Sequence, residues 1–186
     1  SDLIRNSEDP IYSIKYSENK FLSYFIFCLR FLFYNFAKNV WICGYKTRKN
    51  HLKGNVTLIT HSGSVLNSLV DAESRINYNL VVSPGQELVN NISDYLDYAL
   101  ELSSTKVIGI FMETARNPDL FVKGLKKASE KSIPVVVLKV GRTDDSSRMA
   151  QSHSGAMTGS DKAYQAIFKK YGVIRVNSLD EMAFTL

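Results

Sequence analysis

The sequence predicts an α/β fold, with a doubly wound parallel sheet of about five strands and helices on both of its faces. Two observations support this fold class. Short apolar runs rich in β-branched residues recur from residue 54 onward, and turn residues end each of them. Segments with apolar residues at helical spacing lie between these runs. Because strands that alternate with helices form βαβ units, we expect parallel strands joined by right-handed crossovers.

The expected elements follow one another in chain order. From Val56 onward the first strand is apolar or β-branched, as in strands buried on both faces of a sheet. Pro118 follows Asn117 at the start of one helix, and Ser160 with Asp161, and Ser178, are expected to cap two later helices. The expected strands are residues 55–60, 80–82, 107–112, 134–140 and 173–176. The expected helices begin near residues 65, 92, 117, 160 and 178. We therefore assign a flavodoxin-like domain to residues 54–186.

Residues 1–53 are expected to form an aromatic-rich helical extension followed by a basic linker. Aromatic residues are dense between positions 19 and 43, but Arg30 lies near the middle of this segment. A charge at the centre of a bilayer costs about 2.5–3.5 kcal/mol. We therefore favour a helix packed on this domain or on a neighbour, ahead of a surface-seeking amphipathic helix, with a membrane span last. Residues 46–53 read as the exposed basic linker.

Composition excludes several classes of function. The net charge of +5 suits an anionic ligand, but no basic stripe or arm indicates nucleic-acid binding. Cys28 and Cys43 form no CxxC pair, so neither a zinc site nor a disulfide framework is indicated. The acidic pair at residues 144–145 reads as a solvated turn rather than a magnesium site. Because the chain begins without Met or a signal-peptide pattern, we expect a cytoplasmic piece of a longer protein.

The turn after the first expected strand is a candidate phosphate site. It contains Ser62, Gly63 and Ser64 directly before a helix. Ligands of such folds gather at the carboxyl ends of the strands, and the amides of a helix N-terminus attract anions. The alternative is an ordinary capped turn.

Two further residues fall at the same edge of the sheet. His153 stands among small residues in a long loop, 141–159, in which Gly155 and Gly159 allow the backbone to move. Glu113 ends the strand 107–112 and could orient an imidazole through one ring nitrogen. A neutral imidazole can then attack a phosphoryl group to form a phosphoramidate. The alternatives are a surface histidine, and a glutamate that caps the next turn or pairs with Arg116.

The sequence resembles the flavodoxin-like domain of the NDP-forming acyl-CoA synthetases, the superfamily of ADP-forming acetyl-CoA synthetase and succinyl-CoA synthetase. The resemblance covers about residues 54–184. It is carried by residues 54–56 with Ser62-Gly63, by Lys139-Val140-Gly141-Arg142-Thr143, by Ser152-His153-Ser154-Gly155-Ala156 with Gly159-Ser160-Asp161, and by residues 172–181.

The resemblance implies a ligase that joins a carboxylic acid to CoA while a nucleoside triphosphate becomes diphosphate and phosphate. It implies that His153 is transiently phosphorylated, that Glu113 orients it, and that phosphate contacts come from Ser62, Gly63, Ser64, Ser154 and Gly155. The full enzyme would use CoA, ATP/ADP or GTP/GDP, phosphate or acyl phosphate and Mg²⁺, with no tightly bound cofactor and no metal held by this chain.

The sequence also departs from the family. Residues 1–53 lack the expected CoA-binding fingerprint, and no ATP-grasp domain is present, so we expect these domains or subunits as partners and no activity without them. His61 stands where the family usually has Gln or Arg, and the turn at residues 83–87 is altered. The alternative is a non-catalytic scaffold or regulatory module that keeps the fold and an anion-binding turn. An FMN-binding relative is disfavoured because the first turn lacks a hydroxyl-rich phosphate loop.

Overall fold

The computed structural model describes residues 31–38, 40–42, 54–72, 75–85, 87, 89–141 and 160–186. Within them, seven strands form one sheet in the order β2-β1-β4-β3-β5-β6-β7. The strands are β1 (Phe31–Asn35), β2 (Val40–Ile42), β3 (Val56–Thr60), β4 (Tyr78–Pro84), β5 (Val107–Met112), β6 (Val135–Lys139) and β7 (Ile174–Val176). The helices are α2 (Gly63–Ala72), α3 (Ile92–Glu101), α4 (Pro118–Glu130), α6 (Asp161–Tyr171) and α7 (Leu179–Thr185).

The five strands from β3 onward are parallel and confirm the predicted fold class. β3 pairs with β4 on one side and with β5 on the other, and β6 and β7 follow β5 outward. Counted along the chain from β3, the order of these parallel strands is 2-1-3-4-5, which is the flavodoxin order. The strand order therefore reverses between β3 and β5, where folds of this type bind their ligands.

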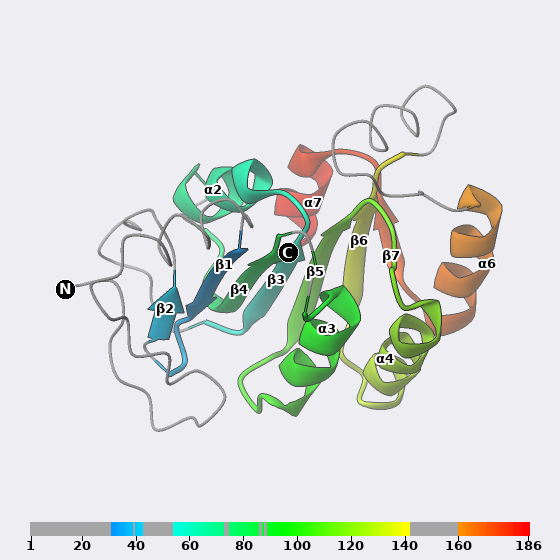
Figure 1. Cartoon of the computed structure of the whole chain (residues 1–186), viewed down its shortest axis with the longest axis horizontal. Coiled ribbons are helices and arrows are strands. Elements are labelled where there is room, and N and C mark those ends of the chain that lie inside the picture. Colours follow the sequence, from blue (N-terminus) through cyan, green and yellow to red (C-terminus); the bar gives the residue numbers. More distant parts are fainter. Residues whose placement is uncertain are drawn as a thin grey trace.

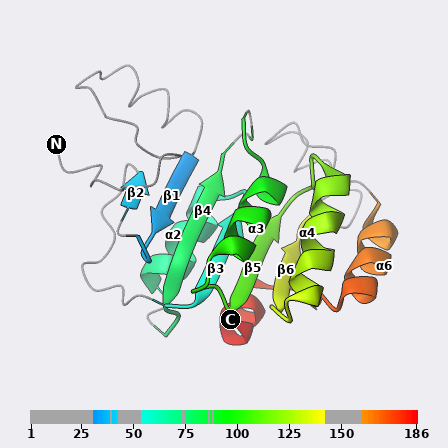
Figure 2. The same cartoon turned by 90° about the horizontal axis from the view of Figure 1, so that it is seen from below.

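Helices cover both faces of the sheet, as predicted. α3, α4 and α6 lie on one face, and α2 and α7 lie on the other (Figures 1 and 2). Successive residues of a strand point to opposite faces, so Ile59 packs into the core beneath α3 and α4 while Leu58 packs into the core beneath α2. All five residues of β3 are buried, because both of its faces are covered.

The aromatic segment is not helical where the structure describes it, and the expected helix is wrong for β1 and β2. β1 pairs antiparallel with the edge of β4, and β2 pairs antiparallel with β1. Phe33 and Tyr34 are 0% and 2% exposed, and they enter the cores on opposite faces of the sheet. β1 can bury both of its faces because a hydrophobic core lies on each side of the sheet. The sheet therefore includes strands that precede residue 54, the expected start of the domain. Residues 1–30 and 43–53 lie outside the described residues.

The helix starts agree with the expected capping residues except at α6. Asn117 accepts a hydrogen bond from the Leu120 amide at 3.1 Å, and Ser178 accepts one from the Glu181 amide at 3.1 Å. Ser160 occupies the N-cap position of α6 but forms no side-chain capping bond, and the Asp161 carboxylate instead accepts a hydrogen bond from Arg175. The ion pair with β7 thus holds the start of α6. None of the helices in the described residues is long and apolar enough to cross a membrane.

Candidate active site

The loops after β3, β5 and β6 meet at the carboxyl edge of the sheet. The His61 amide continues the ladder beyond β3 by donating to the Phe111 carbonyl at 3.1 Å. The Val140 amide likewise donates to the Met112 carbonyl at 3.0 Å. Ser62, Gly63, Ser64 and Glu113 are therefore brought to one edge, at the point where the strand order reverses. His153, Ser154 and Gly155 lie outside the described residues.

The Ser62 turn is built to present amides at the start of α2. The Ser62 amide donates to Thr60 Oγ1 at 3.0 Å, and the Thr60 hydroxyl donates back to the Ser62 carbonyl at 3.1 Å. Ser62 Oγ lies 3.4 Å from the Val65 amide, as in an N-cap, and 2.9 Å from Ser64 Oγ. The first amides of a helix have no intrahelical partner, so those of Gly63 and Ser64 are the donors that this turn can offer to an anion.

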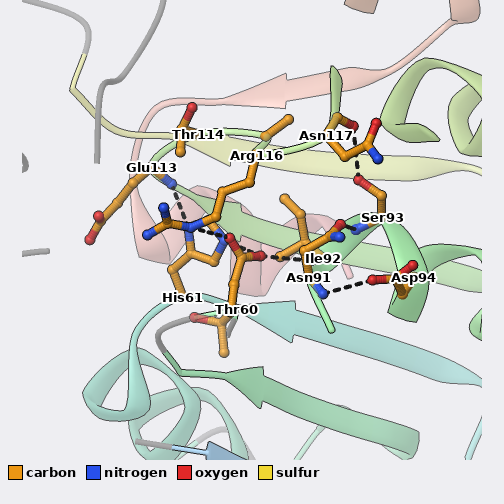
Figure 3. Close-up of polar contacts among 12 residues, drawn as sticks. Thr60, His61, Asn91, Ile92, Ser93, Asp94, Glu113, Thr114, Arg116 and Asn117 are labelled. Atoms are coloured by element: carbon orange, nitrogen blue, oxygen red, sulfur yellow. Dashed lines mark hydrogen bonds and ion pairs between the residues drawn. The ribbon is translucent and has the colours of Figure 1, made fainter. Parts of the chain in front are cut away.

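Glu113 is held through its backbone. Its amide donates to His61 Nδ1 at 3.1 Å, a contact between two loops 52 residues apart in the chain. Figure 3 shows that the Glu113 carboxylate points away from the imidazole of His61. Arg116 Nε lies 3.0 Å from Glu87 Oε2.

A buried network of charges and hydrogen bonds joins these loops. His61 Nε2 lies 3.1 Å from Glu87 Oε1, and the two side chains are only 8% and 2% exposed. Glu87 Oε1 also accepts from the Ile92 amide at 2.7 Å, so the carboxylate lies at the start of α3. Its other oxygen faces Arg116 as an ion pair rather than as an aligned hydrogen bond. One carboxylate thus meets three donors from three separate segments (Figure 3 draws several of these contacts).

The backbone of Glu87 is strained. Its φ is 54°, in the left-handed region that non-glycine residues rarely occupy. Such a conformation costs on the order of 1–3 kcal/mol and persists where the surroundings hold it in place. The charge-assisted bonds of the buried carboxylate provide that hold here.

A buried lysine lies at the same edge of the sheet. Lys139 ends β6 and is 1% exposed, with its Nζ donating to the Val140 carbonyl at 2.6 Å and lying 4.9 Å from the Tyr164 ring. Burial lowers the pKa of the Lys139 ammonium to about 8, while the Asp161 carboxylate partly opposes this shift. The Tyr164 hydroxyl accepts from the Ala115 amide at 2.8 Å, so α6 is tied to the loop after β5.

Reasoning from the sequence missed the roles of His61, Glu87 and Lys139. A single lysine in the otherwise apolar strand at residues 134–140 was a signal that a charged side chain is buried there. Glu87 carried no such signal, because its role depends on a left-handed backbone. Among the described residues, no group of three or more His, Cys, Asp or Glu side chains is arranged to hold a metal ion.

Comparison with known sequences gives ADP-forming CoA ligases among the relatives of this chain. Over 132 residues the chain is 37% identical to an ADP-forming acetate–CoA ligase of Methanocaldococcus jannaschii. This match covers 70% of this chain and 18% of the relative. The chain is also 33% identical to the alpha subunit of ADP-forming acetate–CoA ligase II of Pyrococcus furiosus. That match covers 70% of this chain and 29% of the subunit. The chain therefore spans less than a third of the length of these relatives.

The solved structures agree with the sequence comparison. The fold matches a dinucleotide-forming acetyl-coenzyme A synthetase 1 of Ca. Korarchaeum cryptofilum, solved in complex with phosphate and ADP, with a TM-score of 0.66 and 30% identity. The match covers 74% of this chain and 30% of that one. Residues 53–186 match the family described as the succinyl-CoA ligase like flavodoxin domain, and the chain belongs to that family.

Proposed function

We propose that this chain is the phosphohistidine domain of an NDP-forming acyl-CoA ligase. In this proposal His153 relays phosphate between an acyl phosphate and a nucleoside diphosphate, Glu113 orients it, and the Ser62 turn receives the phosphate. The observation that carries the proposal is the convergence of the Ser62–Ser64 amides and Glu113 on the edge where the loop with His153 begins, directly after β6.

The state of His61 supports the choice of His153 as the phosphate acceptor. The chain has three histidines. His61 lies beside the phosphate turn, but its Nδ1 accepts from the Glu113 amide and its Nε2 faces Glu87. A nucleophile needs a lone pair directed at phosphorus, and both ring nitrogens of His61 are already engaged. The motif around His153 is also the part of the sequence that most specifically resembles the ligase family.

Each chemical step moves one phosphoryl group. A ring nitrogen of neutral His153 attacks the phosphorus of an acyl phosphate, a P–N bond forms, and the P–O bond to the departing carboxylate breaks. In the second step a terminal oxygen of the nucleoside diphosphate attacks the same phosphorus and the P–N bond breaks. The Gly63 and Ser64 amides would stabilise the charge on the phosphoryl oxygens. A carboxylate on the far ring nitrogen, supplied by Glu113, keeps the attacking nitrogen unprotonated.

The remaining substrates would bind to partner domains. The relatives are three or more times longer than the matched region, and one of them is a subunit of a larger ligase. We therefore assign CoA to a CoA-binding partner and the nucleotide with its Mg²⁺ to an ATP-grasp partner. The anionic groups shared with this chain would be phosphate and acyl phosphate.

The test is phosphate labelling of the chain assembled with its CoA-binding and ATP-grasp partners. We expect [γ-³²P]ATP to give an acid-labile, alkali-stable label on the wild-type chain and none on His153→Asn. Glu113→Gln should slow labelling by about 100-fold or more, within the range of losses for acid–base and orienting groups. Rapid-quench sampling measures the rate.

The matched control is His51→Asn, which removes another histidine and should label like the wild type. Label that persists on His153→Asn would show that another residue accepts the phosphate. No label on the wild type in the assembled enzyme would favour the non-catalytic module that keeps only the fold and the anion-binding turn.

A further inference from the structure

The hydrogen-bond partners of His61 fix the tautomer of its neutral ring. The donor at its Nδ1 is a backbone amide, which can only donate, so Nδ1 must carry the lone pair. In the neutral ring the proton therefore resides on Nε2, from which it is donated to Glu87 Oε1 at 3.1 Å. The imidazole is thus a connector with one acceptor and one donor, each committed to a different loop.

Glu87 keeps this connector in one orientation. Its carboxylate is 2% exposed and is held by the Ile92 amide at 2.7 Å and by Arg116 at 3.0 Å. Rotation of the His61 ring would remove the donor from a buried anion and the acceptor from the Glu113 amide at once. Buried carboxylates orient imidazoles in this way in many sites.

We propose that His61 is a positioning residue for Glu113. Ser62, the first residue of the Ser62 turn, directly follows His61 in the sequence. The amide that donates a hydrogen bond to His61 belongs to Glu113. One imidazole therefore sets the separation between the turn that would receive phosphate and the backbone that carries the orienting carboxylate. This inference rests on the proposed function, and it assigns the deviating histidine a role in the same site.

Two substitutions separate the two bonds of His61. In His61→Asn the side-chain oxygen can occupy the place of Nδ1, so the bond to the Glu113 amide can remain while the bond to Glu87 is lost. In His61→Gln the side-chain nitrogen can occupy the place of Nε2, so the opposite bond remains. Each variant loses one hydrogen bond, and the bond lost in His61→Asn is the stronger one because its acceptor is the buried Glu87 carboxylate. A defect that followed stability alone would therefore be larger in His61→Asn.

We expect His61→Gln to form phosphohistidine about tenfold more slowly than His61→Asn, since one neutral hydrogen bond is worth about that factor. The second measurement is amide hydrogen exchange of the isolated chain by NMR. The Glu113 amide should exchange faster in His61→Gln than in His61→Asn. The melting temperature should instead be lower for His61→Asn, because that variant removes a donor from the buried Glu87 carboxylate.

Equal rates of phosphorylation and equal exchange at Glu113 in the two variants would overturn the inference. The exchange measurement needs no phosphate transfer, so it tests the role of His61 even if the wild-type chain never accepts phosphate. A wild type without label, together with fast Glu113 exchange in His61→Gln alone, would reject the proposed function and retain the positioning role.

Discussion

A positive charge is buried at the carboxyl edge of the sheet, where side chains of both signs gather. Lys139 stands in a strand that is otherwise apolar, and its ammonium bonds a carbonyl and faces an aromatic ring. The nearby Asp161 and Glu113 carboxylates favour the charged form and Arg175 disfavours it, but burial is the largest influence on its pKa. The folded state therefore holds the proton of Lys139 less tightly than the unfolded chain does.

Replacing Lys139 by Met should make the stability of the chain less dependent on pH. The pKa of Lys139 falls from 10.5 to about 8 on folding. Between these values the unfolded state binds more protons, so wild-type stability should rise with pH across that window. Below about pH 8 Lys139 is protonated in both states, so the folded wild type carries the full free-energy cost of the buried charge. There Lys139→Met should be more stable than wild type by up to about 3 kcal/mol. The difference should shrink towards pH 10.5.

Urea unfolding at pH 7, 9 and 10.5 measures this effect. The control is Lys126→Met, because the Lys126 side chain is 64% exposed and pairs with Glu130 on the same helix. Its stability difference from wild type should be small. A constant difference for Lys139→Met across the three pH values would show that Lys139 titrates alike in both states.

At the scale of elements, two strands that are buried on both faces differ in how readily the sequence reveals them. β5 was predicted at its observed bounds, because a continuous apolar run between turn residues has few other interpretations. β1 is also largely apolar, with the sequence FLFYN. It lies within a longer aromatic run, so nothing in the local pattern separates this strand from a helix. Its pairing with β2 and β4 distinguishes the two, and the contact with β4 is not local.

The packing of α3 against α4 depends on a glycine. A Cβ at Gly124 would lie 2.6 Å from Leu96 Cδ2 and 3.0 Å from Leu96 Cγ. We expect Gly124→Ala to lower the free energy of unfolding by about 1–3 kcal/mol through overpacking, partly offset by the better helix propensity of alanine. Thermal or urea unfolding of the variant measures the loss.

A double-mutant cycle with Leu96→Ala tests the cause. Removing the Leu96 side chain makes room for the new methyl group, so Gly124→Ala should cost less, or stabilise, in the Leu96→Ala background. Equal effects of Gly124→Ala in the two backgrounds would mean that the contact with Leu96 is not what limits this position.

At the scale of the whole molecule, the topology brings together residues that the sequence keeps apart. The location of the Ser62 turn and Glu113 at one edge could be predicted, because parallel strands align their carboxyl ends. The link between them could not, since His61 is 26 residues from Glu87 and 52 from Glu113. Its partners depend on loop conformations, such as the left-handed Glu87, that no periodic pattern encodes. Hydrogen bonds between loops of this kind can be identified only from the folded structure.

The edge strands give the last prediction, on a chain that starts at residue 54. β1 covers β4 through the register Phe31↔Pro84 to Asn35↔Leu80. Without it, the edge of β4, whose seven residues are all buried in the full chain, would be unpaired, an arrangement that promotes pairing between molecules. We expect residues 54–186 to be less stable in urea than the full chain, and to associate in light-scattering measurements. A chain that starts at residue 31 keeps both edge strands and should stay closer to the full chain. An equally stable, monomeric 54–186 would show that the parallel strands and their helices suffice for a closed fold.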